Sequence, residues 1–431
     1  MITMRKIVKN CRSGCALLLS IFLLTSYHNS NQETTKSTGK DGPETSLTLP
    51  RGFSAAIVAD SLGSLRHLAI NKNGDIYVKL RALKDGKGIF FLRDTDGDGR
   101  MDKSMGFGNY PGTGIRIGGN LLYCSSNSGV FRYQLNDKGE VIDTSRAEVV
   151  VQGLVDRGRD NAKAIALDDN NNLYVAVGSY DETCTDVSGR GKPNCPLLDS
   201  VGGVWQFTTS KVGQSYSDAI HYARGLKNVV GMDWNEATKS LFATSHGRGG
   251  LNSKFPKLYT PDQDKALPAE TLYELNRGAD GGWPFVYYDP FQHKKIVSPE
   301  YGGDGKKSVD NKYLDPVADF PAHLAPNDLL FYTGNMFPEK YKNGAFIVFH
   351  NQSQPLKKGY LVAFVPFKNG KAAGPWEVFA DNFTGVDLSN PAGPLQHRPI
   401  GIAQGPDGAL YVADDLEGTI FKITYPREQK N

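Results

Sequence analysis

One pattern of polar and hydrophobic positions recurs along the chain: a turn of Asn, Asp or Gly, then a short run of apolar, β-branched and aromatic residues. Such runs are typical of strands, and such turn residues are typical of tight connections between them. Six copies lie roughly 45 to 105 residues apart, at residues 71–78, 117–124, 168–179, 236–247, 341–351 and 405–415. Repetition on this scale, with no strong amphipathic helix between most copies, favours small antiparallel sheets arranged around an axis.

We therefore predict an all-β fold, a six-bladed β-propeller over residues 47–431, in which the apolar faces of neighbouring blades bury one another. A β-sandwich is the competing architecture, but it does not require turn-plus-strand units repeated on this length scale. Either architecture suits a composition rich in Gly, Pro, Tyr and Phe.

The longest gap between copies holds the best helical signal, at residues 259–275, where two prolines limit any helix to short pieces. This predicts a long inter-blade insertion over one face of the propeller, the kind of segment that shapes a site. Its continuation carries Trp283, Tyr287 and Tyr288, which either form an aromatic wall or belong to the core.

The amino-terminal residues 1–28 have the basic head and short apolar run of a secretory signal peptide. The apolar run is too short to cross a bilayer, so we expect a secreted or periplasmic protein with no transmembrane span after cleavage. Residues 29–46 read as a disordered polar linker. The net charge of +3 falls to about −1 without the leader, which gives no electrostatic reason to expect nucleic-acid binding.

Of the five cysteines, Cys11 and Cys15 lie in the predicted signal peptide. Cys184 and Cys195 bracket a loop with Gly and Pro, and secretion permits a disulfide there, worth roughly 3 kcal/mol if it constrains the unfolded chain. A zinc site would require more Cys or His nearby. Cys124 lies in an apolar strand and is most simply a small buried residue.

Residues 221–248 place cationic and amide side chains before an apolar strand that ends in a polar turn, residues 245–248. Polar groups at both ends of one strand are how a rigid sheet presents a ligand site, although an ordinary solvated loop has the same residue types. Motifs of a serine-hydrolase elbow, a zincin and a phosphate-binding loop are all missing from the sequence. A triad assembled from distant residues remains open.

Residues 94–102 alternate carboxylates around two glycines, the arrangement of a calcium-binding loop. The candidate ligands are Asp94, Asp96, Asp98 and Asp102. The bidentate Glu of a complete loop is missing, because that position is Met105. A structural Ca²⁺ and a plain acidic turn are both consistent with these residues.

Seven segments together carry a more specific signal: residues 49–70, 177–184, 225–234, 282–290, 298–306, 323–334 and 397–415. With the six copies, they resemble the secreted glucose/sorbosone dehydrogenase family over about residues 47–425. That resemblance implies a six-bladed propeller that binds pyrroloquinoline quinone (PQQ) and Ca²⁺ in a central pocket. Arg and Lys would hold the carboxylates of PQQ, Ca²⁺ would polarise the carbonyl that accepts hydride, and a general base would take the proton of the sugar hydroxyl.

The resemblance also implies roles for single residues. The cofactor-binding positions are Arg66, Lys163, Lys227, Asn228, His323 and Arg398. The carbonyls of Gly247 and Arg248 align with those that hold the quinone-bound Ca²⁺. Asp160 stands where many members have the catalytic His, so it is the predicted base. A second departure is at residues 349–359, which lack the aromatic and Arg of close relatives.

The function that follows is that of a secreted quinoprotein. It would oxidise a hydroxyl or aldehyde of an aldose- or sorbosone-like sugar by hydride transfer to PQQ with Ca²⁺ assistance, and pass electrons to a soluble or membrane acceptor. Two alternatives stay open. One is a catalytically degenerate propeller that binds carbohydrate or protein; the other is a Ca²⁺-dependent, lactonase-like hydrolase.

Overall fold

The computed structural model describes residues 34–36, 45–309 and 311–426. The predicted signal peptide lies outside these residues, as does most of the predicted linker. Within the linker, β1 (Thr34–Lys36) pairs with β2 (Thr48–Pro50). In the described part of the chain, no helix is both long enough and apolar enough to cross a membrane.

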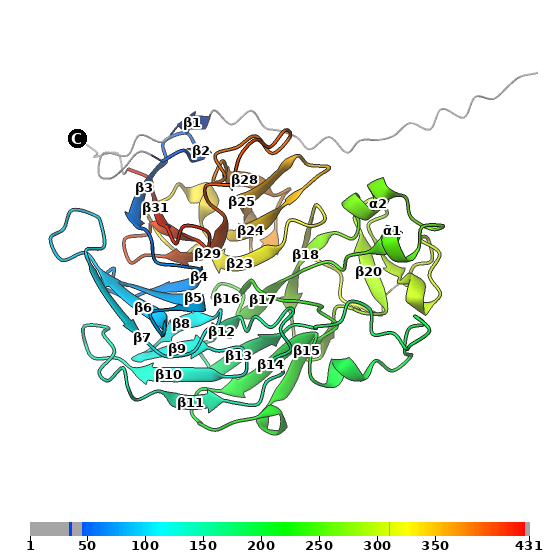
Figure 1. The fold of residues 1–431 in the computed structure, drawn as a ribbon, viewed down its shortest axis with the longest axis horizontal. Helices are drawn as coiled ribbons and strands as arrows, with labels where there is room; N and C mark the ends of the chain where they lie inside the picture. Colours follow the sequence, from blue (N-terminus) through cyan, green and yellow to red (C-terminus); the bar gives the residue numbers. More distant parts are fainter. Residues whose placement is uncertain (1–33, 37–44, 310, 427–431) are drawn as a thin grey trace, which may run out of the picture. The chain divides into compact units, whose positions relative to one another are not determined.

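Six sheets form the blades of a β-propeller, as the sequence predicted (Figure 1). From the inner to the outer strand, blade 1 is β4 (Leu65–Ile70), β5 (Ile76–Lys84), β6 (Lys87–Arg93) and β7 (Lys103–Phe107). Blade 2 is β8 (Ile115–Gly118), β9 (Leu121–Ser125), β10 (Val130–Gln134) and β11 (Glu148–Val151). Blade 3 is β12 (Ile165–Leu167), β13 (Asn172–Val177), β14 (Gly203–Thr208) and β15 (Ile220–Arg224).

The second half of the chain repeats this order. Blade 4 is β16 (Met232–Asn235), β17 (Ser240–Ser245), β18 (Glu270–Leu275) and β22 (Ala318–Phe320). Blade 5 is β23 (Pro326–Phe331), β24 (Ala345–Ser353), β25 (Lys358–Val365) and β28 (Glu377–Ala380). Blade 6 is β29 (Pro399–Gln404), β30 (Leu410–Asp414), β31 (Ile420–Thr424) and β3 (Ser54–Ala59).

The ring is closed by strands from both ends of the propeller. The first long strand, β3, pairs antiparallel with the last, β31, and becomes the outer strand of blade 6. Each inner strand contacts the inner strands of the two neighbouring blades, including β29 with β4. Such closure leaves only short, protected edges, which removes the edge-pairing hazard of an open sheet.

Each of the six sequence copies is the first turn and second strand of one blade. These strands read as nearly continuous apolar runs because neighbouring blades bury both of their faces. In β24, Phe346 and Val348 face blade 6, whereas Ile347 and Phe349 face blade 4. One buried cluster of this kind fills each of the six blade interfaces, so the core of the protein lies between the blades.

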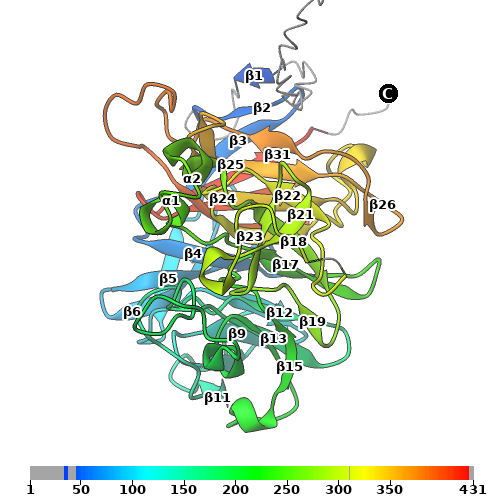
Figure 2. The same cartoon turned by 90° about the vertical axis from the view of Figure 1, so that its right-hand side faces the viewer.

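The predicted insertion exists, but it lies within blade 4 rather than between two blades, because its two parts connect consecutive strands of that blade. Between β17 and β18 lie two short helices, α1 (Leu251–Lys254) and α2 (Pro261–Ala266). Between β18 and β22 lie β19 (Ala279–Asp280), β20 (Val286–Asp289) and β21 (Lys294–Val297), with β19 pairing parallel to the outer strand of blade 3. Figure 2 looks onto this side of the propeller. The expectation of short helical pieces is confirmed for α2, but Glu270–Leu275 forms strand β18 because it pairs with β17.

Smaller elements lie between the blade strands. A two-stranded ribbon in blade 5 is formed by β26 (Phe367–Lys368) and β27 (Lys371–Ala372). Four single-turn 3₁₀ helices complete the set: Pro196–Asp199, Tyr216–Asp218, Pro299–Tyr301 and Glu339–Tyr341.

A disulfide joins Cys184 to Cys195 in the long loop between β13 and β14, and Cys124 is a buried free cysteine. Replacing both bridged cysteines with serine should lower the free energy of unfolding by about 3 kcal/mol, because the bridge closes a loop of about this length in the unfolded chain. Urea denaturation measures the loss. Reduction of the wild-type protein should give the same loss, and an unchanged denaturation curve after reduction would contradict the prediction.

Candidate functional site

The topology brings the loops before all six inner strands to one face of the propeller. In a blade of four antiparallel strands, the fourth strand ends at the edge where the first begins. Each connection to the next blade therefore crosses the same face, which we call the entry face. The turn between the second and third strands of each blade lies there too. Residues that precede an inner strand are thus neighbours in space although they are far apart in the sequence.

This rule applies to the predicted cofactor residues. Lys163 precedes β12, Lys227 and Asn228 precede β16, and His323 precedes β23. Arg398 precedes β29, and Arg66 is the second residue of β4. All of these positions therefore lie at the entry face. Most of their side chains belong to one of two groups, and the remaining two side chains point elsewhere.

The first group surrounds Lys227, which is almost fully buried. Its Nζ lies 2.7 Å from Asp160 Oδ2 and 3.3 Å from Glu182 Oε1. Asn228 Nδ2 is 3.4 Å from Asp160 Oδ1. A Cβ on Gly178 would meet the Asp160 carbonyl at 2.4 Å and Asn228 Oδ1 at 2.5 Å, so only glycine lets these loops approach. The predicted base and the predicted cofactor pair thus meet in one ion-pair network.

Asp160 itself has a left-handed backbone, with φ of 49°, which costs energy in a non-glycine residue. Its neighbour Arg159 forms an ion pair with Glu182, and Gly249 N donates to the other Glu182 oxygen at 3.3 Å. Two carboxylates, Asp160 and Glu182, therefore share the Lys227 ammonium. Both are partly open to solvent, as a residue that meets a substrate must be.

His246 and Glu270 hold the turn after β17. His246 Nε2 is 3.1 Å from the Pro326 carbonyl and Nδ1 is 3.4 Å from Asn228 Nδ2. Burial, reinforced by the Lys227 charge, lowers the pKa of His246 to about 4. The ring is therefore neutral at pH 7, with a proton on Nε2 and an acceptor lone pair on Nδ1. Glu270 accepts from the N–H of Gly247 at 2.9 Å, and burial raises its pKa to about 7.

The second group surrounds Asp415, whose side chain is fully buried. Arg398 forms a two-point ion pair with it, at 2.7 Å from Nε and 3.1 Å from Nη2. The pKa of Arg66 is lowered to about 10, mainly by burial and then by repulsion from the Arg81 and Arg398 guanidiniums. The negative charge of Asp415 acts in the opposite direction and raises this pKa. The charges that act on Arg66 are thus two guanidiniums, Arg81 and Arg398, and one carboxylate, Asp415, and this balance favours an anion beside Arg66.

His350 and Tyr360 border this second group. His350 Nδ1 donates to the Pro399 carbonyl at 2.9 Å, and burial lowers its pKa to about 4, so its Nε2 is an acceptor, 3.4 Å from Asp415. Tyr360 interacts electrostatically with Arg398 and has a strained φ of 50°. Residues 349–359 lack the expected stacking aromatic, but Tyr360, one residue further, supplies an aromatic ring at this edge.

Beneath the entry face, side chains from opposite blades meet on the axis. His67 of blade 1 donates from Nε2 to the Asn327 carbonyl of blade 5 at 2.8 Å. Arg116 of blade 2 reaches Asp328 of blade 5 at 3.4 Å and the Met232 carbonyl of blade 4 at 3.3 Å. Since blades 2 and 5 face each other across the ring, these groups form a polar floor below any ligand at the entry face.

Two predicted cofactor residues point elsewhere. Lys163 is fully buried, its Nζ donates to the Asn161 carbonyl at 2.7 Å, and burial lowers its pKa to about 8. One donor of its ammonium is thus used within its own loop, and the whole residue is buried away from the surface. The His323 ring lies 2.8 Å from the Asp264 carbonyl of α2, because its left-handed backbone (φ 69°) turns the side chain toward the insertion. The predicted contact of both side chains with a cofactor has no support in this geometry.

The predicted metal residues form two separate places. Gly247 and Arg248 lie in the turn after β17 at the entry face. No described residue donates a hydrogen bond to the Gly247 carbonyl, which leaves it available to a cation. Arg248 holds the turn through a buried ion pair with Glu300, 2.7 Å long.

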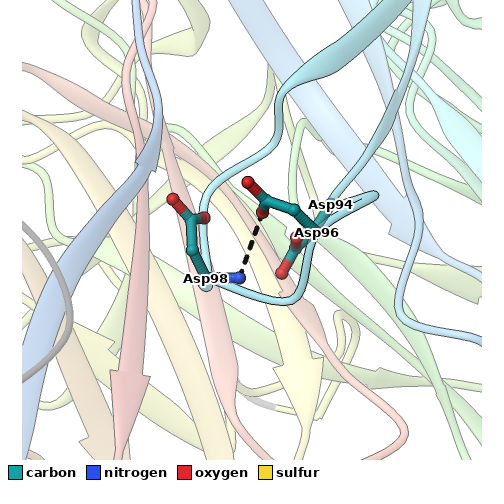
Figure 3. Close-up of side chains that lie close together, drawn as sticks. All are labelled: Asp94, Asp96 and Asp98. Carbon is teal, nitrogen blue, oxygen red and sulfur yellow. Dashed lines mark hydrogen bonds between the residues drawn. The ribbon is translucent and has the colours of Figure 1, made fainter.

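The second place, residues 94–102, is the turn between β6 and β7, which lies on the face opposite the entry face. The ligand oxygens of Asp94, Asp96 and Asp98 lie within 4.8 Å of one another (Figure 3). Asp102 accepts a hydrogen bond from the Thr95 N–H of the same loop and is not part of this cluster. The neighbouring Arg100 pairs with Asp60 beside β3. This loop thus contacts the closing strand β3, through Arg100 and the Ile57 carbonyl.

The entry face fits a cofactor that carries carboxylates. Arg66 Nε and Asn228 Oδ1 are buried and have no hydrogen-bond partner among the described residues. A buried polar group without a partner costs free energy, so each position favours a ligand that supplies one. The excess of guanidiniums over carboxylates beside Arg66 favours an anionic ligand. The carboxylates and carbonyls of PQQ can accept a hydrogen bond from Arg66 Nε, whereas Asn228 Oδ1, itself an acceptor, requires a donor from a ligand.

Sequence reasoning missed several polar residues of the entry face. Glu182 and Asp415 follow the second strand of a blade, His350 lies near the end of the second strand of blade 5, and Tyr360 lies on the third strand of that blade. One sequence feature could have identified the first three. Each of these lies near the carboxyl end of one of the six turn-plus-strand copies, close to the turn that leads to the third strand. Glu270 and Glu300 gave no such signal, because they act through backbone and ion-pair contacts inside blade 4 and its insertion.

A six-bladed propeller with basic and amide side chains on one face agrees with what the resemblance seen in the sequence implies. The chain belongs to the TrAA12-like family, whose model matches residues 47–285 and 293–426. This confirms the resemblance seen in the sequence.

Two relatives and several solved structures are similar to this chain. A pyrroloquinoline quinone-dependent sugar dehydrogenase of Hypocrea jecorina (strain QM6a) is 20% identical over 90% of this chain and 88% of its own length. An uncharacterised protein of Borreliella burgdorferi is 27% identical, and that match spans 48% of each protein. Among solved structures, a Trichoderma reesei family AA12 enzyme has a TM-score of 0.71 at 18% identity, covering 88% of this chain and 98% of its own.

The PQQ domain of pyranose dehydrogenase from Coprinopsis cinerea has a TM-score of 0.70 at 19% identity, covering 89% of this chain and 98% of its own. At these identities the structural likeness shows the fold.

Proposed function

We propose that this protein is a PQQ- and Ca²⁺-dependent oxidoreductase that oxidises an aldose- or sorbosone-like sugar after export to the periplasm or the medium. The observation that carries the proposal is the buried Arg66 Nε that lacks a partner, on a residue acted on by the charges of Arg81, Arg398 and Asp415. The family match supports the same conclusion. When bound, PQQ would supply the hydride acceptor.

The residues of this chain would do the rest. Arg66 and Arg398 would bind carboxylates of the cofactor, because guanidiniums form paired hydrogen bonds with them. Asn228 would offer Oδ1 as an acceptor, and the Gly247 and Arg248 carbonyls would hold Ca²⁺. The His67 and Asp328 floor would close the site from below, which excludes water from the axis.

Asp160 would receive the proton of the sugar hydroxyl at Oδ1 or Oδ2. In the structure its charge is balanced by Lys227 at 2.7 Å, so the ammonium orients the carboxylate. Substrate binding must leave one carboxylate oxygen free for the hydroxyl proton. Lys227 also contacts Glu182, which keeps the ammonium in place when Asp160 takes up a proton.

Replacing Asp160 with asparagine should therefore lower turnover about 100-fold or more, the loss typical of a missing general base. The test is dye reduction by protein reconstituted with PQQ and Ca²⁺ on a panel of aldoses. Asp156→Asn is the matched control, since Asp156 is an exposed carboxylate in the same loop that bonds only Asn161 among described residues.

The wild-type result tests the proposed function as a whole. Reduction of the dye that requires PQQ, Ca²⁺ and a sugar supports it. Sugar binding without dye reduction would instead identify a propeller that binds carbohydrate and has lost catalysis. Release of acid from a sugar lactone without PQQ would identify the lactonase-like hydrolase.

A further inference from the structure

A cavity lies beside the entry face, between the turn after β17 and the blade 4 insertion. It shares Lys227, Gly247 and Arg248 with the candidate site, and its far wall includes Trp283 and Lys295. Its volume is about 40 Å³. A water molecule requires about 10–15 Å³ on this scale, so the cavity accepts a group of about three heavy atoms and excludes a sugar ring.

Lys295 is the unusual residue of this wall. It lies on β21, its side chain is buried, and its Nζ donates to Tyr273 Oη at 2.6 Å and to the Gly281 carbonyl at 2.7 Å. An ammonium group has three N–H donors, so one of them remains for a ligand. The Tyr273 ring lies 4.8 Å from the ammonium and helps to hold it.

The charges around the cavity do not balance. Lys227 is paired with Asp160 and Glu182, and Arg248 is paired with Glu300. For Lys295, no carboxylate of the described residues comes within ion-pair distance; both of its acceptors are neutral oxygens. A buried cation without a counter-ion is costly, so this wall favours an anionic group.

We propose that the cavity is a subsite for the carboxylate of an acidic sugar, such as a uronate, with Lys295 as its counter-charge. The cavity has room for a carboxylate, and its lining includes Lys227 and the Gly247 turn, beside which the sugar ring would lie. The identification of the rest of the ligand as a sugar rests on the proposed function. The argument that Lys295 favours an anionic group is independent of that function.

The test is calorimetric titration of the protein without PQQ. The probes are sodium D-glucuronate and sodium D-galacturonate, each compared with its neutral amide, which has nearly the same shape. We expect at least one acid to bind about tenfold or more tightly than its amide, since a charge-assisted hydrogen bond is lost in the amide. Equal affinities for acid and amide, or no binding of either acid, would overturn the proposal.

Two variants locate the effect. Lys295→Met should remove the preference for the acid, and Lys294→Met should keep it, because Lys294 is the exposed neighbour on the same strand. A preference that survives in a folded Lys295→Met protein overturns the assignment of Lys295. If that variant does not fold, the comparison of acid and amide binding to the wild-type protein still tests whether the cavity prefers a carboxylate. Because binding is measured without PQQ, failed dye reduction would refute the proposed function and leave this subsite standing.

Discussion

Replacing Glu300 with alanine is expected to lower the free energy of unfolding by about 3–5 kcal/mol. Glu300 and Arg248 form an ion pair of 2.7 Å, and their side chains are 1% and 3% exposed. Removing one partner leaves the other charge buried and unpaired, which is among the most destabilising single changes in proteins. Urea denaturation followed by circular dichroism measures the loss.

Two controls separate the buried charge from other causes. The double variant Arg248→Met/Glu300→Leu should recover most of the stability, because it removes both charges and keeps apolar volume. Asp262→Ala, which breaks a surface ion pair with Lys265, should change stability by less than about 0.5 kcal/mol. A Glu300→Ala loss as small as that of Asp262→Ala would show that Arg248 finds another partner.

Replacing Arg66 with alanine is expected to weaken PQQ binding about 10- to 100-fold. Arg66 has a buried Nε without a partner, and its lowered pKa reflects burial and the neighbouring guanidiniums of Arg81 and Arg398. An anionic ligand would relieve both effects, and hydrogen bonds to charged groups contribute about 1.5–3 kcal/mol each. Fluorescence titration with PQQ in the presence of Ca²⁺ measures the change.

Arg398→Ala should weaken PQQ binding by a similar factor and also destabilise the protein, because it leaves Asp415 buried without its two-point partner. Arg146, on an outer loop and 86% exposed, is the control, and its replacement should leave PQQ affinity unchanged. Equal PQQ affinity in Arg66→Ala and wild type would place the cofactor away from the second group of the entry face.

The sequence predicted the fold because the second strand of every blade is buried on both faces. Residues such as Phe346 to Phe349 must all be apolar to fill two interfaces, and a strand of this kind stands out against its polar turns. The first and outer strands are shorter or partly exposed, so they gave no repeat. The pairing of β3 with β31 could not be predicted from the local sequence pattern. These two strands lie at opposite ends of the propeller sequence and pair only when the ring closes.

The candidate site was predicted only in part, for a physical reason. The position of a residue just before, or at the start of, an inner strand determines the face of the propeller on which it lies. Sequence position therefore sufficed to place Arg66, Lys227 and Arg398 at the entry face. It does not fix the direction of a side chain. Local backbone geometry turned His323 toward α2, and burial withdrew Lys163. Counter-charges such as Asp415 come from a different loop, which no spacing rule reveals.

Basic side chains from separate blades are expected to bind one PQQ at the entry face. The most direct test of this expectation is to titrate the folded wild-type protein with PQQ in the presence of Ca²⁺, remove free cofactor, and measure the quinone absorbance that remains. If these side chains bind the cofactor, the protein should retain about one PQQ per chain. A folded protein that retains none would contradict it.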